Sequence, residues 1–410
     1  MLVSGHLSAS NEELRKSGVW NLPGPNPHLV AHYMPWFAAQ KISNHAENAW
    51  VHWKWTEKGP VRHPTNVNEK GLRNISSVYY PLIGPYNSWD PSVIRYHLKT
   101  AKAAGIQAFL LDWYGPGRNE DVPVQALLDE ANKLDMRIAI CYEEKINFPP
   151  YLNPTNREMF LDNVTSDLSY VLTRYGSHPA YLKRNNVPFV YQFNGFGTGK
   201  IGAKYLKPVE WKKVFENLPG PVSYGRQGLD SQYYPTLQGA YLWWTMDPDW
   251  IDRFTKQAVE LKKAGNLEYF ISMICPGFDD TGVWGWGGGP RKVDRCGLSI
   301  LRDTMDRSLA GDPELVQIVT WNDFEEGTVV EPTRDFGYWY LDAIETWWGE
   351  KTGRPVDLND NREPFREYAS ACSGVSKGEL PADSWDAYLV CRKLEVEHSN
   401  ILINVYGKKK

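Results

Sequence analysis

Residues 106–142 read IQAFLLDWYGPGRNEDVPVQALLDEANKLDMRIAICY, and this stretch contains the unit from which the fold can be predicted. Residues 106–112 and 136–142 are short, nearly continuous apolar runs, which are typical of strands buried on both faces of a parallel sheet. Between them, residues 122–134 repeat apolar side chains at helical spacing. The stretch therefore predicts a strand, a helix and a second, parallel strand.

The same alternation continues on both sides of this unit. Six further apolar runs predict strands at residues 29–34, 187–193, 221–224, 238–244, 269–275 and 315–321. Helical patterns lie at residues 157–175, 250–264 and 293–309, and a further helix is expected from Asp90-Pro91 to Gly105. No clear helix follows residues 221–224. The pattern predicts an α/β fold, a closed (β/α)8 TIM barrel, because right-handed strand–helix–strand units repeated in this way close on themselves.

An open, doubly wound sheet is the alternative topology for such an alternation. It would carry a glycine-rich phosphate loop directly after the first strand, and no such loop occurs there. The glycine-rich segment 285–289 (GWGGG) precedes Pro290 and lacks the strand–turn–helix context of a phosphate site. We interpret it as a loop around a ligand or as a plain loop.

The chain outside the alternating region divides into three parts. We expect an N-terminal segment over residues 1–28, the barrel over residues 29–349 and a short C-terminal extension over residues 350–410 that packs on the barrel. The first βα loop, residues 37–89, is long and rich in Trp and His, so we expect it to be ordered and functional. In the extension, residues 387–397 and 401–407 could form an additional strand pair.

Charge and hydropathy exclude two kinds of partner. The 410 residues include 45 basic and 49 acidic side chains, a formal net charge of −4, whereas a nucleic-acid-binding protein would show a basic patch or stripe. No apolar run approaches the roughly 20 residues that span a bilayer. The start of the chain shows no signal-peptide pattern, so the compartment stays open: secreted or periplasmic if a signal peptide has been removed, and cytoplasmic otherwise. The sequence indicates no oligomeric state.

The unusual feature of the composition is its content of large amphipathic rings. The chain has 18 Trp and 23 Tyr. These side chains combine an apolar body with a polar tip, so they suit ligands such as sugars, which have C–H faces and hydroxyl edges. An aromatic-rich core is the structural alternative.

Acidic and aromatic residues recur where the predicted strands end. In a (β/α)8 barrel, substrate-binding and catalytic groups come from these carboxyl ends and the loops after them. The candidate residues are Tyr33, Trp36, Asp112, Trp113, Tyr114, Glu143, Glu144, Asn194, Trp243, Asp279, Asp280, Trp321, Asn322, Asp323, Glu325 and Glu326. They predict an acidic, aromatic cleft, which suits glycosidic bond cleavage because that reaction needs two carboxyl groups. A salt-bridged barrel mouth is the alternative.

Other chemistries find little support. The nine histidines are spread out, with no His-Glu-x-x-His motif, so we expect no metal and no cofactor. The adjacent Asp279 and Asp280 could hold a divalent cation only with further ligands. Neither a Gly-x-Ser-x-Gly nor a Cys-x-x-Cys motif occurs. Cys372 and Cys391 could form a disulfide.

Four motifs follow one another in a fixed order within residues 30–345. They are residues 79–86 (YYPLIGPY), 112–117 (DWYGPG), 275–281 (CPGFDDT) and 320–328 (TWNDFEEGT), the last followed by Glu331-Pro332. Together they resemble the motifs of glycoside hydrolase family 99 endo-α-mannosidases, whose last motif reads Asn-Glu-Trp-His-Glu-Gly-Thr followed by an acid. The resemblance implies a (β/α)8 barrel that hydrolyses α-linked glycans, usually within the glycan chain.

Asp323 departs from the family 99 motif, which has Glu at this place. An Asp–Glu pair at this spacing is closer to the related family 71 α-1,3-glucanases. Family 99 retains the anomeric configuration with help from the sugar's own 2-hydroxyl, whereas family 71 inverts it, so stereochemistry and mannose preference stay open. The resemblance implies that Glu326 is the general acid/base and that Asp323 activates the substrate hydroxyl or a water. Glu325 could replace Asp323 in this role, and the other candidate residues are expected to bind the sugar. For Tyr33, a position in the core is the alternative.

We therefore expect an endo-acting hydrolase of an α-linked glycan, mannan-like or glucan-like, whose partner is an oligosaccharide or polysaccharide. Two alternatives belong to other classes: a non-catalytic glycan-binding barrel and a barrel enzyme of polysaccharide biosynthesis. Neither alternative would release reducing ends, so a hydrolysis assay separates them from the hydrolase.

Overall fold

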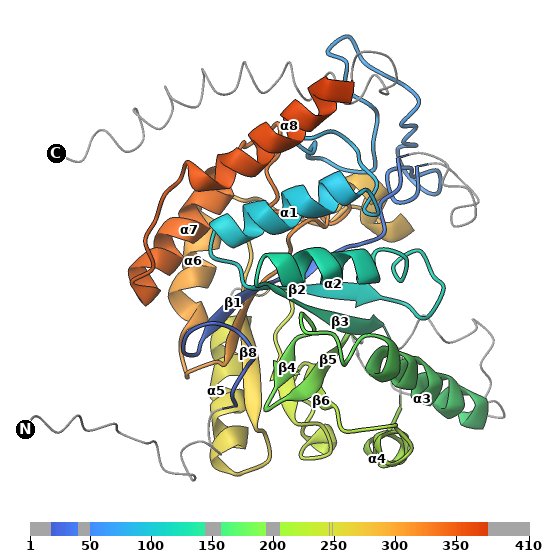
Figure 1. Ribbon diagram of the computed structural model, residues 1–410, viewed down its shortest axis with the longest axis vertical. Coiled ribbons are helices and arrows are strands. Elements are labelled where there is room, and N and C mark those ends of the chain that lie inside the picture. Colours follow the sequence, from blue (N-terminus) through green and yellow to red (C-terminus); the bar gives the residue numbers. More distant parts are fainter. Residues whose placement is uncertain are drawn as a thin grey trace, which may run out of the picture.

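The centre of the molecule is a barrel of parallel strands, seen in a computed structural model that describes residues 18–39, 50–143, 157–193, 206–245, 247 and 249–375 (Figure 1). The barrel strands are β1 (His28–Tyr33), β2 (Ala108–Trp113), β3 (Arg137–Glu143), β5 (Val187–Phe193), β6 (Ser223–Gln227), β7 (Gly239–Tyr241), β8 (Tyr269–Ile274) and β11 (Leu315–Ile318). β1 pairs with both β2 and β11, and β3 pairs with β5, so the sheet closes on itself. A short β4 (Lys183–Arg184) runs antiparallel to β5.

All eight predicted strands are confirmed in order, and their ends differ by a few residues. The last strand ends at Ile318 because the next part of the chain folds back, with the Thr320 N–H donating to the Thr328 carbonyl (3.0 Å). The helix predicted over residues 293–309 begins only at Ser299. Residues before it form β10 (Lys292–Val293), which pairs antiparallel with β9 (Phe278–Asp279).

Helices lie around the outside of the barrel. They are α1 (Pro91–Ala103), α2 (Val124–Lys133), α3 (Arg157–Arg174), α4 (Pro208–Glu216), α5 (Trp250–Lys263), α6 (Ser299–Ser308) and α7 (Trp339–Thr352). Between β6 and β7, where the sequence shows no helical pattern, the chain makes only a 3-10 turn at Ser231–Tyr233. Among the described helices, none is both long and apolar enough to cross a lipid bilayer.

After α7, the chain continues into α8 (Glu363–Val375), which packs on α1. The Tyr96 ring of α1 lies 6.1 Å from Phe365 and 5.6 Å from Tyr368. Figure 1 shows α8 lying beside α1 on the outside of the barrel. The possible strand pair of the extension and the possible Cys372–Cys391 bridge fall outside what the structure describes.

A buried ion pair lies beneath aromatic rings at the amino-terminal end of the barrel. Arg184 donates two hydrogen bonds to the Glu314 carboxylate, at 2.8 and 3.1 Å, and both side chains are almost fully buried. The Trp20 indole N–H donates to the same carboxylate (3.0 Å), and its ring packs edge-on against Phe189 and Tyr269. These contacts fill this end of the barrel, so a substrate site is expected at the carboxyl ends of the strands.

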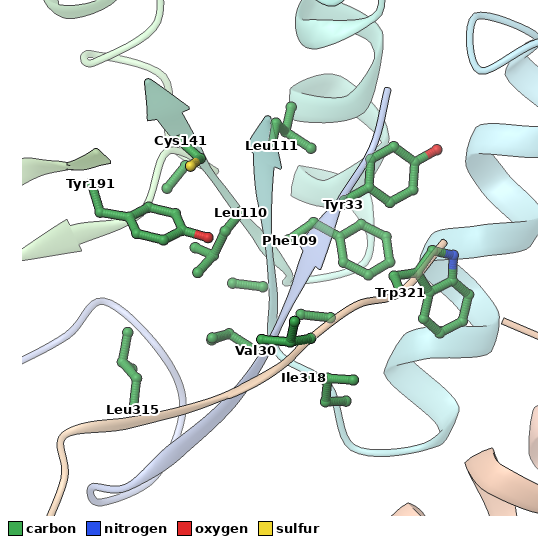
Figure 2. Close-up of a cluster of buried hydrophobic side chains, with 14 of the residues drawn as sticks. Val30, Tyr33, Phe109, Leu110, Leu111, Cys141, Tyr191, Leu315, Ile318 and Trp321 are labelled. Atoms are coloured by element: carbon green, nitrogen blue, oxygen red, sulfur yellow. The ribbon is translucent and has the colours of Figure 1, made fainter. Parts of the chain in front are cut away.

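The barrel strands separate an inner from an outer layer of buried side chains. Figure 2 shows Tyr33 and Phe109 on one side of β1 and β2, with Cys141 and Tyr191 on the other side. Phe109 stacks on Tyr33 at 4.8 Å and lies 5.4 Å from Trp321. The two layers follow from the strand geometry, in which successive side chains point to opposite faces.

Candidate active site

The loop after β11 brings Asp323 and Glu326 together in one tight turn. The Asp323 N–H donates to the Thr320 hydroxyl (2.8 Å), and the Asp323 carboxylate accepts from the Glu326 N–H (2.9 Å). The Thr320 and Thr328 hydroxyls lie 3.0 Å apart and close the loop at its base. Asp323 is 2% exposed, whereas the Glu326 side chain is 22% exposed. The turn therefore presents one buried and one accessible carboxyl.

The Asp323 carboxyl is electrostatically perturbed. Burial raises its pKa well above the usual range, and the negative charges of Glu326 and Glu325 raise it further. The nearby negative charges therefore favour a proton on Asp323. Acid–base catalysis by two carboxyls requires this kind of asymmetry between the members of the pair.

Glu326 faces the loop between β8 and α6. The Trp286 indole N–H donates to its carboxylate (3.2 Å), and a guanidinium nitrogen of Arg291 lies 3.8 Å from the same oxygen. The Glu326 carbonyl also accepts from the Asp279 N–H (2.8 Å). The glycine-rich segment 285–289 thus borders a candidate catalytic carboxylate, which supports its interpretation as a loop around a ligand.

Glu325 pairs with His52, a histidine of the long first loop. His52 Nδ1 lies 2.8 Å from a Glu325 oxygen, and the His52 ring stacks on Trp36 at 4.3 Å. The pKa of His52 is raised. Burial alone would lower this pKa, but the negative charge and hydrogen bond of Glu325 and the negative charge of Glu120 together have the larger effect. Burial raises the pKa of Glu325, and the charge and hydrogen bond of His52 partly offset this rise. This pairing supports Asp323, rather than Glu325, as the partner of Glu326.

Replacing His52 with glutamine should destabilise the protein more at low than at high pH. A histidine whose pKa is raised on folding adds stability that is fully present below its unfolded pKa, 6.5, and is lost as pH rises through the folded pKa. We expect a loss of about 1.5–3 kcal/mol near pH 5.5 and a smaller loss near pH 9, measured by urea unfolding. The exposed His63→Gln in the same loop is the control. An equal loss at both pH values would contradict the charged pair.

Asp112 and Glu143 extend the acidic cluster from the ends of β2 and β3. Both are buried. Burial raises the pKa of Tyr114 well above its usual range, and the charges of Asp112 and Glu143 raise it further. The charge of Asp112 also raises the pKa of Asp323. These groups therefore form one electrostatic cluster with the catalytic candidates.

His32, Asp112 and Cys141 have donor atoms within 4.8 Å of one another inside the barrel, so they could hold a metal ion. His32 Nδ1, however, lies 2.5 Å from the Tyr191 hydroxyl, so this ring nitrogen already has a hydrogen-bond partner. Burial lowers the pKa of His32 to about 3 and raises the pKa of Cys141, so burial favours a neutral imidazole and a protonated thiol. We interpret the group as a hydrogen-bonded cluster inside the barrel, with Trp243 edge-on against His32 at 4.7 Å.

Three of the aromatic candidates lie between the barrel and its helices. The Tyr33 hydroxyl is 3.0 Å from His97 Nδ1 on α1, and the Trp321 ring lies 5.9 Å from the same imidazole. The Trp113 indole donates to Asp121 (2.9 Å). Trp113 also stacks on Tyr170 of α3 at 6.3 Å, so the structure places all three side chains toward the helices.

Two further acidic candidates are bound by cationic side chains. Asp279 pairs with Lys292 (3.0 Å), and the fully buried Asp280 accepts from Arg291 Nε (2.7 Å). Both carboxylates considered for a divalent cation are thus engaged, and the second pairing holds Arg291 beside Glu326.

Asn322 has a structural contact. It accepts from the Met34 N–H (2.7 Å) and donates to the Met34 carbonyl (3.0 Å), which ties the loop after β11 to the chain after β1. Glu144 and Asn194 fall outside the described residues.

Sequence reasoning missed Glu120 and gave no role to His52 or Trp286. Glu120 lies in the loop after β2 and is 5% exposed, but an acid shortly before a helix is an ordinary capping pattern, so nothing marked it. A signal for Trp286 existed, because a single large ring among glycines is poorly placed for core packing. His52 could be recognised only from its partner, which lies in a distant loop.

Comparisons with known proteins show the family to which this chain belongs. The family model described as glycosyl hydrolase family 99 matches residues 25–345. The chain is 24% identical over 351 residues to a human glycoprotein endo-alpha-1,2-mannosidase-like protein, covering 77% of this chain and 71% of the relative. It is also 24% identical over 363 residues to a rat glycoprotein endo-alpha-1,2-mannosidase, covering 78% and 72%. The GH99 endo-alpha-mannosidase structure from Bacteroides thetaiotaomicron matches with a TM-score of 0.63 and 21% identity, covering 85% of this chain and 100% of that chain, and it shows the same fold.

Proposed function

Because this chain belongs to glycosyl hydrolase family 99, we propose that it is an endo-acting α-mannosidase in which Asp323 and Glu326 form the catalytic pair. The geometry of these two carboxyls supports their assignment as the catalytic pair. One turn at the carboxyl end of the barrel holds a buried and an accessible carboxyl three residues apart, linked through a backbone N–H. The two environments differ in the way that acid–base chemistry requires.

In this mechanism, Glu326 protonates the leaving oxygen of the scissile bond. Its accessible side chain suits that step, since the leaving part of the glycan must depart toward solvent. Asp323 takes a proton from the sugar's own 2-hydroxyl or from a water. Aspartate is one methylene shorter than the glutamate of the family motif, so its carboxyl stands back from the sugar and leaves room for either partner.

The reverse assignment has one observation in its favour. The raised pKa of Asp323 favours a proton on this residue, as a general acid requires. The two assignments differ in which variant still cleaves a substrate whose leaving group needs no protonation.

The preference for α-1,2-linked mannose is carried over from the names of the relatives and needs its own test. We expect the protein to release oligosaccharides, rather than single mannoses, from α-1,2-linked mannan chains. Incubation with α-1,2-, α-1,3- and α-1,6-mannans and α-1,3-glucan, with sizing of the products, measures this. Cleavage of glucan only would move the substrate toward family 71, and release of mannose only would contradict endo action.

A further inference from the structure

An exposed tryptophan stands next to the proposed acid/base and has no role in the mechanism above. Trp286 is 42% exposed and is the one aromatic side chain among the large exposed hydrophobic residues of the described chain. Its indole N–H donates to Glu326, so one edge of the ring is anchored at the carboxylate. An exposed apolar ring with a bound polar edge is the arrangement that proteins use to bind amphipathic ligands.

The loop that carries this ring has a strained and well-supported backbone. Trp284, Gly285 and Trp286 have φ values of 51°, 58° and 54°, in the left-handed region that large side chains rarely adopt. Such conformations persist where surrounding contacts enforce them, and they gather at ligand sites. Two contacts within this loop hold its backbone in place. The Gly285 N–H donates to the Asp280 carbonyl (3.1 Å), and the buried Asp280 side chain binds Arg291.

The long first loop supports the same ring from a second direction. Trp55 packs edge-on against Trp286 at 5.8 Å. Gly59 of the same loop allows the backbone of the first loop to approach the neighbouring Trp284, because a Cβ at this position would lie 2.2 Å from the Trp284 ring. Two loops that are distant in sequence therefore meet to hold Trp286 beside Glu326, with part of its ring in solvent.

We propose that Trp286 binds the leaving-group sugar and also positions the Glu326 carboxyl. The inference rests on the proposed function. A general acid donates its proton to the oxygen that joins the two halves of the substrate, so the leaving sugar must lie beside Glu326. Trp286 contacts that carboxylate, and its exposed ring suits stacking on the C–H face of a sugar. Trp286 is thus a specificity-determining residue through its ring and a positioning residue through its N–H.

Two substrates and two variants test the proposal. The substrates are an α-1,2-linked mannan oligosaccharide and the α-fluoride of the same donor sugars, whose fluoride leaving group needs neither a sugar site nor an acid. Trp286→Ala removes the ring and its N–H, and Trp286→Phe keeps a ring without the N–H.

For Trp286→Ala, we expect kcat/KM for the oligosaccharide, divided by kcat/KM for the fluoride, to fall about tenfold or more, because KM for the oligosaccharide rises and kcat falls. For Trp286→Phe, we expect most of the KM effect to be restored while kcat on the oligosaccharide stays lowered.

Each other outcome has a defined meaning. If both variants lose activity on the two substrates in equal proportion, Trp286 acts only on the fold and the proposal is overturned. If neither variant changes the ratio, the ring binds no leaving-group sugar and the proposal is also overturned. If the wild-type protein cleaves neither substrate, the proposed function itself fails. The wild-type measurement alone shows this outcome, without the variants.

Discussion

Replacing Glu326 with glutamine should lower kcat on an α-1,2-linked mannan oligosaccharide by about 10²–10⁴-fold, the contribution typical of one general acid–base group. Glutamine keeps the shape of the side chain and can still accept the Trp286 hydrogen bond through its amide oxygen. The fold should therefore be preserved, and urea unfolding of the variant should match the wild type closely. Near-normal turnover by a folded Glu326→Gln protein would remove Glu326 from the mechanism.

The same variant and its partner distinguish the two assignments of acid and base. A glycosyl fluoride needs no protonation of its leaving group, so it should rescue the variant that lacks the acid and should not rescue the variant that lacks the base. We expect the fluoride to restore much of the activity of Glu326→Gln and little of that of Asp323→Asn. Rescue of Asp323→Asn alone would establish the reverse assignment, which the raised pKa of Asp323 favours.

Removing Arg184 should have the largest effect on stability. Its guanidinium is 5% exposed and binds Glu314, which is 3% exposed, through two hydrogen bonds. The change Arg184→Ala leaves a carboxylate buried without its cation, which typically costs about 3–5 kcal/mol. Trp20 would still donate to Glu314, but a neutral N–H compensates a buried charge less well than a guanidinium does.

Two controls show whether this cost comes from the buried charge. Arg366→Ala breaks an exposed pair with Glu363 and should cost less than about 1 kcal/mol. The double variant Arg184→Met with Glu314→Leu replaces both charges by apolar side chains, and it should be less destabilised than Arg184→Ala. Urea unfolding measures all three proteins. A double variant that is less stable than the single one would contradict the explanation.

The barrel could be predicted from the sequence because most of its strands are nearly continuous apolar runs that alternate with helical patterns. That topology alone locates the strand ends, and so it locates Asp112, Glu143 and Asp323. The prediction included Trp113 because it took the consecutive residues 112–114 at the end of this strand. Side chains alternate along a strand, so Trp113 points to the helices while Asp112 points into the barrel.

The contacts between loops could not be predicted in the same way. His52 reaches Glu325 across 273 residues of chain, and Trp286 reaches Glu326 from the preceding βα loop. Loops return to the mouth along paths set by turns such as the left-handed stretch at Trp284, and hydrophobic periodicity carries no information about those paths. The motif therefore located the two carboxyls, whereas their surroundings required the structure.

The central claim is that Asp323 and Glu326 together cleave an α-mannosidic bond, and time-resolved NMR of the anomeric signals tests it most directly. Wild-type protein and Glu326→Gln are incubated side by side with an α-1,2-linked mannan oligosaccharide. We predict a new reducing-end signal with the wild type and almost none with the variant. If the α anomer appears first, Asp323 acts through the sugar's 2-hydroxyl, and if the β anomer appears first, it activates a water. No new reducing end with the wild type, or equal rates for the two proteins, would contradict the account.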